Sequence, residues 1–490
     1  MILTLFAFLP EIVLLIFAAG LLIWGVFRER NGGTVELPRT KINSTIGVRF
    51  SVFVFFMSYL YFMGHSSRFY GHYFYGLMRI DSFALFGKFL ITLLGFLWMG
   101  FRFRVIEDPL VRNGFSSFEY PVLFLFSLLG GFCLLSSTDF LSAYLSLELQ
   151  MLPLYGILAF RRTNLKSLEA AFKYFVLGTL GSLLLLYGIA LVYGYGGTTN
   201  FRELMEIIDF GGGSLETLIW LKLGVLFITT GLLFKLSLVP FHMWTPDVYE
   251  GSCSVQLPFI ALVPKITALF LLIRLWIGPF AGVLSLSYLL SWIGAFSIVI
   301  GALLALRQNH LRRLMAYGSV AHMGFILMGI SVGTRHGFSA SIAHVVVYGL
   351  SFTGFFLGLI SMKKADQEIE TIDDLKGLWI KKPSLALLLM VMILSSAGLP
   401  PFAGFWTKMH LMVAALRHDF YPQVFLALFG ALLSFFYYLR LLRAIFFEKH
   451  PNNLLHCQNY AFPFLMILSL LLTGAFIFQE KAFYYLGRLF

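Results

Sequence analysis

The chain has 490 residues, of which 59% are hydrophobic and only 12% are charged, whereas soluble domains carry about 25% charged residues. This composition argues against a soluble enzyme and predicts a polytopic membrane protein. The net charge of +12 does not indicate nucleic-acid binding, because most basic residues lie in short loops between apolar runs, where they report topology.

The chain contains about 14 apolar runs of the roughly 20 residues that a helix needs to cross a bilayer. The first run is too long for a signal peptide and lacks a basic segment before it, so it is interpreted as a retained span. An all-α polytopic membrane protein is therefore predicted. The runs cover residues 5–27, 46–64, 80–101, 118–136, 138–160, 168–193, 218–240, 254–276, 283–305, 311–332, 338–362, 384–414, 422–447 and 460–478.

Lysines and arginines are distributed unequally between alternate loops. The loops after odd-numbered runs hold 22 of them, whereas the opposite loops hold 8. The positive-inside rule places the richer side in the cytoplasm or matrix. Both termini are then expected on the opposite side, the intermembrane space or periplasm.

The seventh run continues into GLLFKLSLVPFHMWTPDVYEG and predicts a broken helix that carries a cation. Lys235 lies five residues before Pro240. Because proline has no N–H, Pro240 is expected to free the carbonyl of Leu236, and Pro246 that of His242. Open backbone at membrane depth is tolerated only in a protein interior or beside water, so ion passage is predicted here.

The twelfth run contains a second break, SSAGLPPFAGFWTKM. Pro400 and Pro401 are expected to free the carbonyls of Ser396 and Ala397, and Lys408 follows about two turns later. Two interrupted helices at corresponding places predict two inverted repeats with sites near the middle of the membrane. The alternative is that the prolines only kink helices for packing.

Other ionisable residues lie inside apolar runs, where such groups are functional candidates by default. They are Glu148 in FLSAYLSLELQML, Lys265 after Pro264, and the histidines His322 and His344. For Glu148 the alternative is a buried salt bridge that fixes packing. For each histidine it is a hydrogen-bonded packing group.

Four further ionisable residues lie nearer the ends of runs. Lys222 can extend to the membrane surface, and Lys88 is ambiguous. Lys173 is one turn after Glu169 and is expected to form an ion pair with it. Glu11 suits the positive first turn of a helix and is treated as structural.

The motifs that would supply energy or redox chemistry are missing from the sequence. It contains no Gly-x-x-x-x-Gly-Lys-Ser/Thr loop and no Gly-x-Gly-x-x-Gly between a strand and a helix. Cys133, Cys253 and Cys457 form no metal-binding spacing, so no cofactor or metal is expected in the chain. Proton movement must be driven by a gradient or a partner.

Five segments resemble one known family. FHMWTPDVYEG, LELQMLPLYGILAFRR, EAAFKYFVLG, RRLMAYGSVAHMGFILMGI and GLPPFAGFWTK are similar to the antiporter-like membrane subunits of respiratory complex I, and most to its subunit N branch. The resemblance runs from about Leu141 to Met409. The chain departs from the family at Gly251–Pro258, GSCSVQLP, where a proline is missing and Cys253 is added.

The resemblance implies which residues translocate protons. They are Glu148 and Lys235 as a carboxylate–lysine pair, Lys173 in the proton path, Lys265 as the central lysine, Lys408 as the lysine facing the exit, and His242 and His322 in the hydrophilic axis. His344 joins them as a candidate relay residue from its place in an apolar run.

The function implied is coupling of NADH oxidation and ubiquinone reduction to proton pumping, within NADH:ubiquinone oxidoreductase. NADH, FMN, iron–sulfur clusters and ubiquinone would be bound by partner subunits, and the partners would include antiporter-like sister subunits and lipid. Two alternatives stay open: a stand-alone cation/proton antiporter, and a scaffold whose buried charges are relics.

The expected organisation is an N-terminal three-helix segment at 1–117, antiporter-like repeats at 118–280 and 281–447, and a C-terminal helix at 448–490. The 55 phenylalanines and the first span favour the mitochondrial inner membrane. The alternative is a bacterial cytoplasmic membrane.

Overall fold

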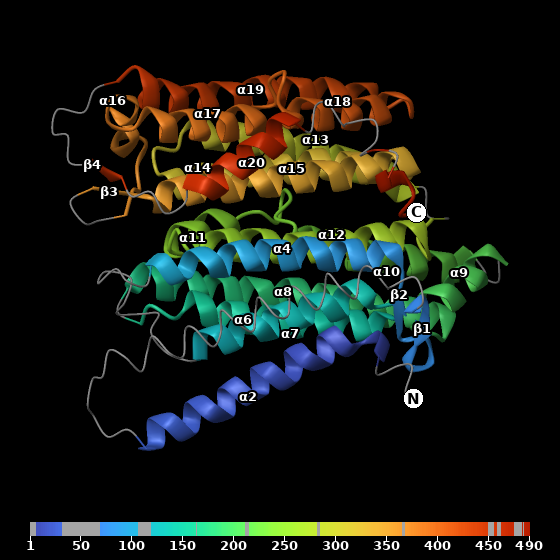
Figure 1. Ribbon diagram of the computed structural model, residues 1–490. Helices are drawn as coiled ribbons and strands as arrows, with labels where there is room; N and C mark the ends of the chain where they lie inside the picture. Colours follow the sequence, from blue (N-terminus) through green and yellow to red (C-terminus); the bar gives the residue numbers. More distant parts are fainter. Residues whose placement is uncertain are drawn as a thin grey trace. The chain divides into compact units, whose positions relative to one another are not determined.

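The computed structural model describes residues 6–31, 69–105, 119–162, 164–210, 215–281, 285–364, 368–448, 455–457, 462–474, 483 and 485–490. The chain divides into two compact units. Unit 1 comprises Met1–Leu232 and Phe259–Pro279, and unit 2 comprises Leu233–Pro258 and Phe280–Phe490. Within each unit the helices lie side by side (Figure 1). The predicted four-part division stays a prediction.

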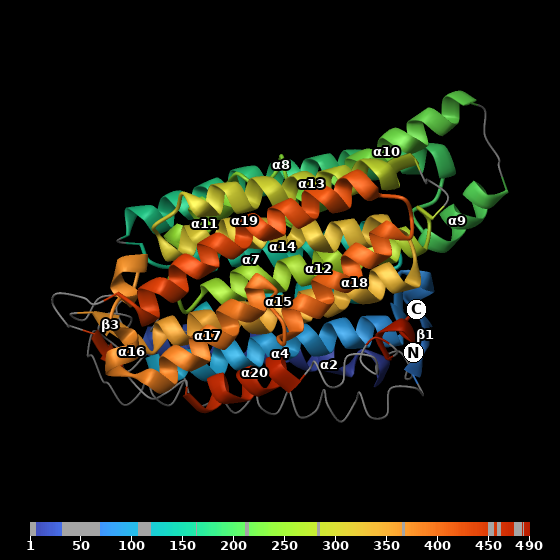
Figure 2. The ribbon, with the colours of Figure 1, turned by 90° about the horizontal axis from the view of Figure 1, so that it is seen from above.

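Unit 1 is a helical bundle with a small hairpin. Polar side chains begin its helices: the Asp139 carboxylate accepts hydrogen bonds from the first backbone N–H groups of α7, as the Asn164 side chain does for α8 and Asn200 for α9. Figure 2 shows α9 at the same end of the bundle as the start of α10. The helices are α2 (Leu9–Asn31), α4 (Ser82–Val105), α6 (Glu119–Ser136), α7 (Phe140–Leu158), α8 (Leu165–Gly196), α9 (Phe201–Asp209), and most of α10 (Leu215–Lys235) and α12 (Leu257–Ile277).

The hairpin of unit 1 joins β1 (Gly71–Tyr73) to β2 (Met78–Ile80) through a short 3-10 helix, Phe74–Gly76. The strands are antiparallel, with Gly71 opposite Ile80. This short strand pair is an addition to the predicted all-α fold. Strand pairing here satisfies the backbone groups of a segment that links two helices.

Unit 2 is a second bundle, which also carries a short strand pair. In this pair β3 (Met362–Lys364) lies antiparallel to β4 (Leu455–Cys457). Along the chain, β3 comes after the helix that ends at Ile360, and β4 comes before the helix that begins at Phe462. The helices are α11 (Trp244–Gly251), α13 (Ser285–Leu306), α14 (Leu311–Ser331), α15 (Arg335–Ile360), α16 (Leu378–Lys381), α17 (Pro383–Ala397), α18 (Ala403–Leu416), α19 (Tyr421–Phe446) and α20 (Phe462–Gly474), with a 3-10 turn at Ile372–Leu375.

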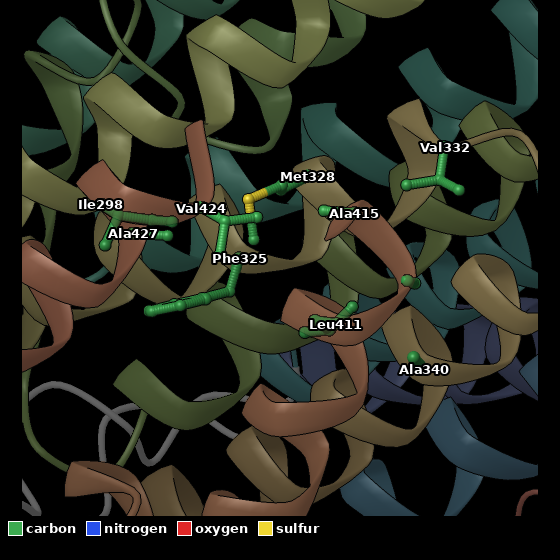
Figure 3. Packing of buried hydrophobic residues seen from close by; sticks show 10 residues of the cluster. Ile298, Phe325, Met328, Val332, Ala340, Leu411, Ala415, Val424 and Ala427 are labelled. Carbon is green, nitrogen blue, oxygen red and sulfur yellow. The ribbon is translucent and has the colours of Figure 1, made fainter. Parts of the chain in front are cut away.

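A glycine contact brings α13 and α14 of unit 2 close together. A Cβ at Gly324 would lie 2.6 Å from the carbonyl oxygen of Gly294, so the two backbones touch directly. One apolar cluster of the unit, here called its apolar core, lies around these helices (Figure 3). It is formed by Ile298, Phe325, Met328, Val332, Ala340, Leu411, Ala414, Ala415, Val424 and Ala427.

The predicted apolar runs correspond closely to helices. Among the described residues ten helices are long and apolar enough to cross a membrane, and α4, α17 and α20 contain shorter apolar segments. The run at 46–64 lies outside the described residues, so the count of 14 stays a prediction. The two predicted interruptions are confirmed, since α10 stops before α11 and α17 stops before α18.

Candidate functional site

The second interrupted helix places a buried lysine on open backbone. Lys408 on α18 is 4% exposed, and its Nζ donates hydrogen bonds to the carbonyl oxygens of Ser396, at 2.8 Å, and Ala397, at 3.0 Å. These are the two carbonyls that the prolines were expected to free. The amine therefore lies at the carboxyl end of α17, where the helix dipole favours a positive charge.

Two glycines make this arrangement possible. Gly398 ends α17 with φ of 83°, and a Cβ there would lie 2.9 Å from Cδ of Lys408. A Cβ at Gly404 would lie 1.8 Å from the carbonyl oxygen of Ser395, so α18 starts against the end of α17. On its other side, Nζ of Lys408 lies 5.4 Å from the ring centroid of Phe325, a member of the apolar core.

A chain of hydrogen bonds runs through unit 2 and ends beside this lysine. Tyr438 Oη lies 3.2 Å from Nε2 of His322, and Nδ1 of His322 lies 3.2 Å from Nε2 of His344. Nδ1 of His344 lies 2.9 Å from Oγ1 of Thr407, the residue before Lys408. All four side chains are buried, so the chain links α19, α14, α15 and α18 away from water.

Two arrangements of hydrogens satisfy these bonds, and they differ in the direction of the Thr407 hydroxyl. Its single hydrogen has carbonyl acceptors on its own helix, Gly404 at 3.2 Å and Ala403 at 3.4 Å. With that hydrogen so used, His344 donates to Thr407 from Nδ1, His322 donates to His344, and the Tyr438 hydroxyl donates to His322. Reversing every bond gives the other consistent arrangement. Passage of one proton converts the first arrangement into the second, which is the property of a proton relay.

The first interrupted helix lies in unit 2 from Leu233 onward. Lys235 is the last residue of α10 and is 2% exposed. Side chains hold the open segment that follows: Ser297 Oγ accepts from the backbone N–H of Val239 at 3.0 Å. The Trp244 indole N–H donates to the carbonyl of Phe234 at 3.1 Å. Lys235 thus belongs to the helix that ends here, whereas Lys408 contacts the end of α17 from α18.

One expectation for this break is wrong. The carbonyl of His242 is not free, because the backbone N–H of Thr245 donates to it at 3.1 Å across a turn. The His242 ring is half-buried, 6.5 Å from the ring of Tyr317, and its Nδ1 has no hydrogen-bond partner among the described residues. The structure thus joins His322 and His344 but shows no hydrogen bond from His242 to them within the described part of the chain.

Two arginines at the start of α14 bind the segment after the break. Arg313 Nη1 lies 3.0 Å from the carboxylate of Asp247 and 2.8 Å from that of Glu250. Arg312, 5% exposed, donates to the backbone carbonyl of Glu250 at 3.1 Å and to the carboxylate of Glu368 at 2.6 Å. These bonds fix α11 to α14.

Unit 1 contains the remaining predicted residues. Glu148 on α7 is half-buried, and its Oε1 has no hydrogen-bond partner among the described residues. Lys265 on α12 is 2% exposed. On the same two helices, the Thr267 hydroxyl donates to Oε1 of Gln150 at 2.8 Å. The pairing of Glu148 with Lys235 stays a prediction, because the two residues belong to different units.

Lys173 differs from the other lysines in its exposure. Its Nζ lies 2.7 Å from the carboxylate of Glu169 one turn earlier, which confirms the expected ion pair. Its side chain is 40% exposed, beside the exposed ring of Phe172. Lys173 therefore faces the outside of unit 1.

The sequence reading missed Thr407 and Tyr438. Thr407 adjoins Lys408, which was a usable signal. Tyr438 lies in an apolar run with a second tyrosine, and nothing in the sequence singles it out. Only the packing of α19 on α14 brings it to His322.

A comparison with known families matches residues 137–434 to the model described as NADH:quinone oxidoreductase/Mrp antiporter, TM. NADH-quinone oxidoreductase subunit N of Paramagnetospirillum magneticum is 37% identical over 454 residues, which cover 90% of this chain and 88% of the relative. Subunit N 1 of Acidiphilium cryptum is 40% identical over 388 residues, 78% of this chain and 79% of the relative.

The chain belongs to the subunit N family of NADH-quinone oxidoreductases.

Solved structures agree with this assignment. A chain of respiratory complex I from Thermus thermophilus aligns with a TM-score of 0.77 and 28% identity, covering 97% of this chain and 98% of that one. A chain of the Mrp complex from Dietzia shares the fold, with a TM-score of 0.81 and 18% identity. The alignment covers 99% of this chain and 96% of that one. The fold class is confirmed. The chain is a multi-pass, proton-translocating membrane subunit of complex I in a hetero-oligomeric assembly, and the stand-alone antiporter is not favoured.

Proposed function

We propose that protons cross this subunit through the ionisable residues on its interrupted helices and their neighbours. The lysines and carboxylate are Glu148, Lys173, Lys235, Lys265 and Lys408, with His242, His322 and His344 as relay residues. NADH oxidation and ubiquinone reduction by partner subunits, which would hold NADH, FMN, iron–sulfur clusters and ubiquinone, supply the driving force. In this way the chain contributes to the activity of a proton-translocating NADH:ubiquinone reductase.

One observation supports this proposal above the others: Lys408 contacts two backbone carbonyls, and its neighbour Thr407 ends the hydrogen-bonded chain of histidines. A lysine ammonium has three N–H donors and the neutral amine has two. Two donors bind Ser396 and Ala397, so both hydrogen bonds persist when the third proton leaves. Deprotonation therefore costs no backbone hydrogen bond, and the lysine can exchange protons without opening the break.

The test compares Lys408→Gln and Lys408→Met with Lys222→Met, a lysine exposed on α10. Glutamine keeps an N–H₂ donor but cannot ionise near neutral pH. NADH-driven proton pumping and quinone reduction are measured together in assembled complex. Both should fall in the Lys408 variants and persist in the control. Unchanged pumping in Lys408→Gln would make Lys408 a packing residue.

We infer that the subunit works in the mitochondrial inner membrane, with both termini on the intermembrane-space side. The phenylalanine-rich composition and the unequal distribution of basic residues support this. The relatives above are bacterial, which supports the alternative of a bacterial cytoplasmic membrane with periplasmic termini. Accessibility of an added terminal tag in sealed vesicles of known orientation tests the sidedness.

A further inference from the structure

Unit 1 contains a buried ion pair that lies outside the matched antiporter region. The Nζ of Lys88 on α4 donates a hydrogen bond to Oε1 of Glu11 on α2. The side chains are 2% and 7% exposed. The second carboxylate oxygen, Oε2 of Glu11, is buried and has no hydrogen-bond partner among the described residues. Both residues precede residue 137, where the family match begins.

The hairpin of unit 1 lies near this pair. Phe8 packs edge-on against Tyr73 of β1, with ring centroids 5.6 Å apart, and the Lys88 ammonium lies 5.5 Å from the centroid of the Phe8 ring. The Tyr73 hydroxyl donates to the carbonyl of Phe69 at 2.8 Å. Figure 1 shows the hairpin at the same end of unit 1 as the start of α2. The apolar cluster formed by Ala7, Phe8, Tyr73, Ile80 and Leu85 thus adjoins the pair.

Stability alone does not account for this ion pair. Removing two charges from water is costly, and replacing a buried pair with apolar residues of similar size is often neutral or stabilising. A carboxylate oxygen left without a donor adds to that cost. The same oxygen is the atom on which a proton can be placed without breaking the bond between Oε1 and the lysine.

We propose that Glu11 and Lys88 form a further proton-binding pair of this subunit, in the N-terminal helices rather than in the antiporter repeats. The inference rests on the proposed function, since the pumping cycle supplies the proton. In the loading step an O–H bond forms at Oε2 of Glu11, and the neutral acid stays beside the Lys88 ammonium. In the release step that bond breaks, the proton leaves, and the ion pair is restored.

The test uses assembled complex that carries Glu11→Gln, Lys88→Met, or both. The double variant removes both charges while keeping side chains of similar size. Its control is Arg202→Met with Glu206→Gln, which removes an ion pair with exposed side chains on α9. Protons pumped per NADH oxidised are measured together with the infrared C=O stretch of protonated carboxyl groups during turnover.

The proposal expects fewer protons per NADH in the assembled double variant than in the control, and loss of a carboxyl band in Glu11→Gln. It is overturned if the double variant assembles and pumps like the control with all bands retained. It is also overturned if only the single variants fail to assemble and the double variant regains full pumping, or if the double variant fails to assemble. Each of these results assigns the pair to folding. Full pumping by Lys408→Gln would instead refute the proposed function, whatever the Glu11 variants do.

Discussion

Replacing Thr407 by valine should break the histidine chain at its end beside Lys408. Valine has the shape of threonine but offers no oxygen to Nδ1 of His344, which lies 2.9 Å from the Thr407 hydroxyl. Thr407→Ser is the matched control, because it keeps the hydroxyl and removes only a methyl group. The prediction is that proton transfer slows in the valine variant and continues in the serine variant.

The size of the effect on the rate follows from the burial of these hydrogen-bonded side chains. A buried N–H that loses its acceptor costs about 1–3 kcal/mol. If that cost falls on the transfer step, the step slows by roughly 5- to 150-fold, because each 1.36 kcal/mol is a factor of ten in rate. His344 is 1% exposed, so water does not reach it to replace the lost acceptor.

The assay measures NADH-driven pumping and quinone reduction in membranes with matched amounts of assembled complex. The rate of pumping in Thr407→Val should fall by roughly 5- to 150-fold. The rate in Thr407→Ser should stay near that of the unsubstituted protein. Equal pumping by the two variants would show that protons do not pass through Thr407, and the relay reading of His322 and His344 would then be wrong.

Two further outcomes are expected. In Gly404→Ala the new Cβ would lie 1.8 Å from the carbonyl oxygen of Ser395. We therefore expect the free energy of unfolding to fall by more than about 3 kcal/mol, and the variant to fail to assemble on native gels. Gly194→Ala on α8, with nothing within 4 Å, should assemble normally, and equal assembly of the two variants would contradict the close contact. The imidazole of His310, whose Nε2 lies 3.7 Å from a carboxylate oxygen of Glu370, lowers the pKa of Glu370 in the loop before α16. Its stabilising contribution is present above the ordinary value of 4.5 and disappears as pH falls through the lowered pKa. Thermal midpoints across this acidic range should fall less steeply in His310→Gln, and an unchanged slope would refute the link.

Much of the fold and part of the site could be predicted from the sequence, because their causes are local. Apolar runs of sufficient length become helices in a membrane whatever they pack against. A proline lacks an N–H in any context, so the positions of the two prolines alone identify the carbonyls of Ser396 and Ala397, to which Lys408 donates in the structure. The ion pair of Lys173 with Glu169 likewise depends only on helical spacing.

The tertiary structure decided which distant groups meet. His322, His344, Thr407 and Tyr438 lie on four helices, and Glu11 is 77 residues from Lys88. Glu11 reads from the sequence as a first-turn carboxylate, and nothing local indicates its partner. These contacts depend on the rotation and crossing of packed helices, which side-chain volumes set across the whole bundle. A local pattern fixes where a helix breaks, whereas only packing determines which side chain faces the break.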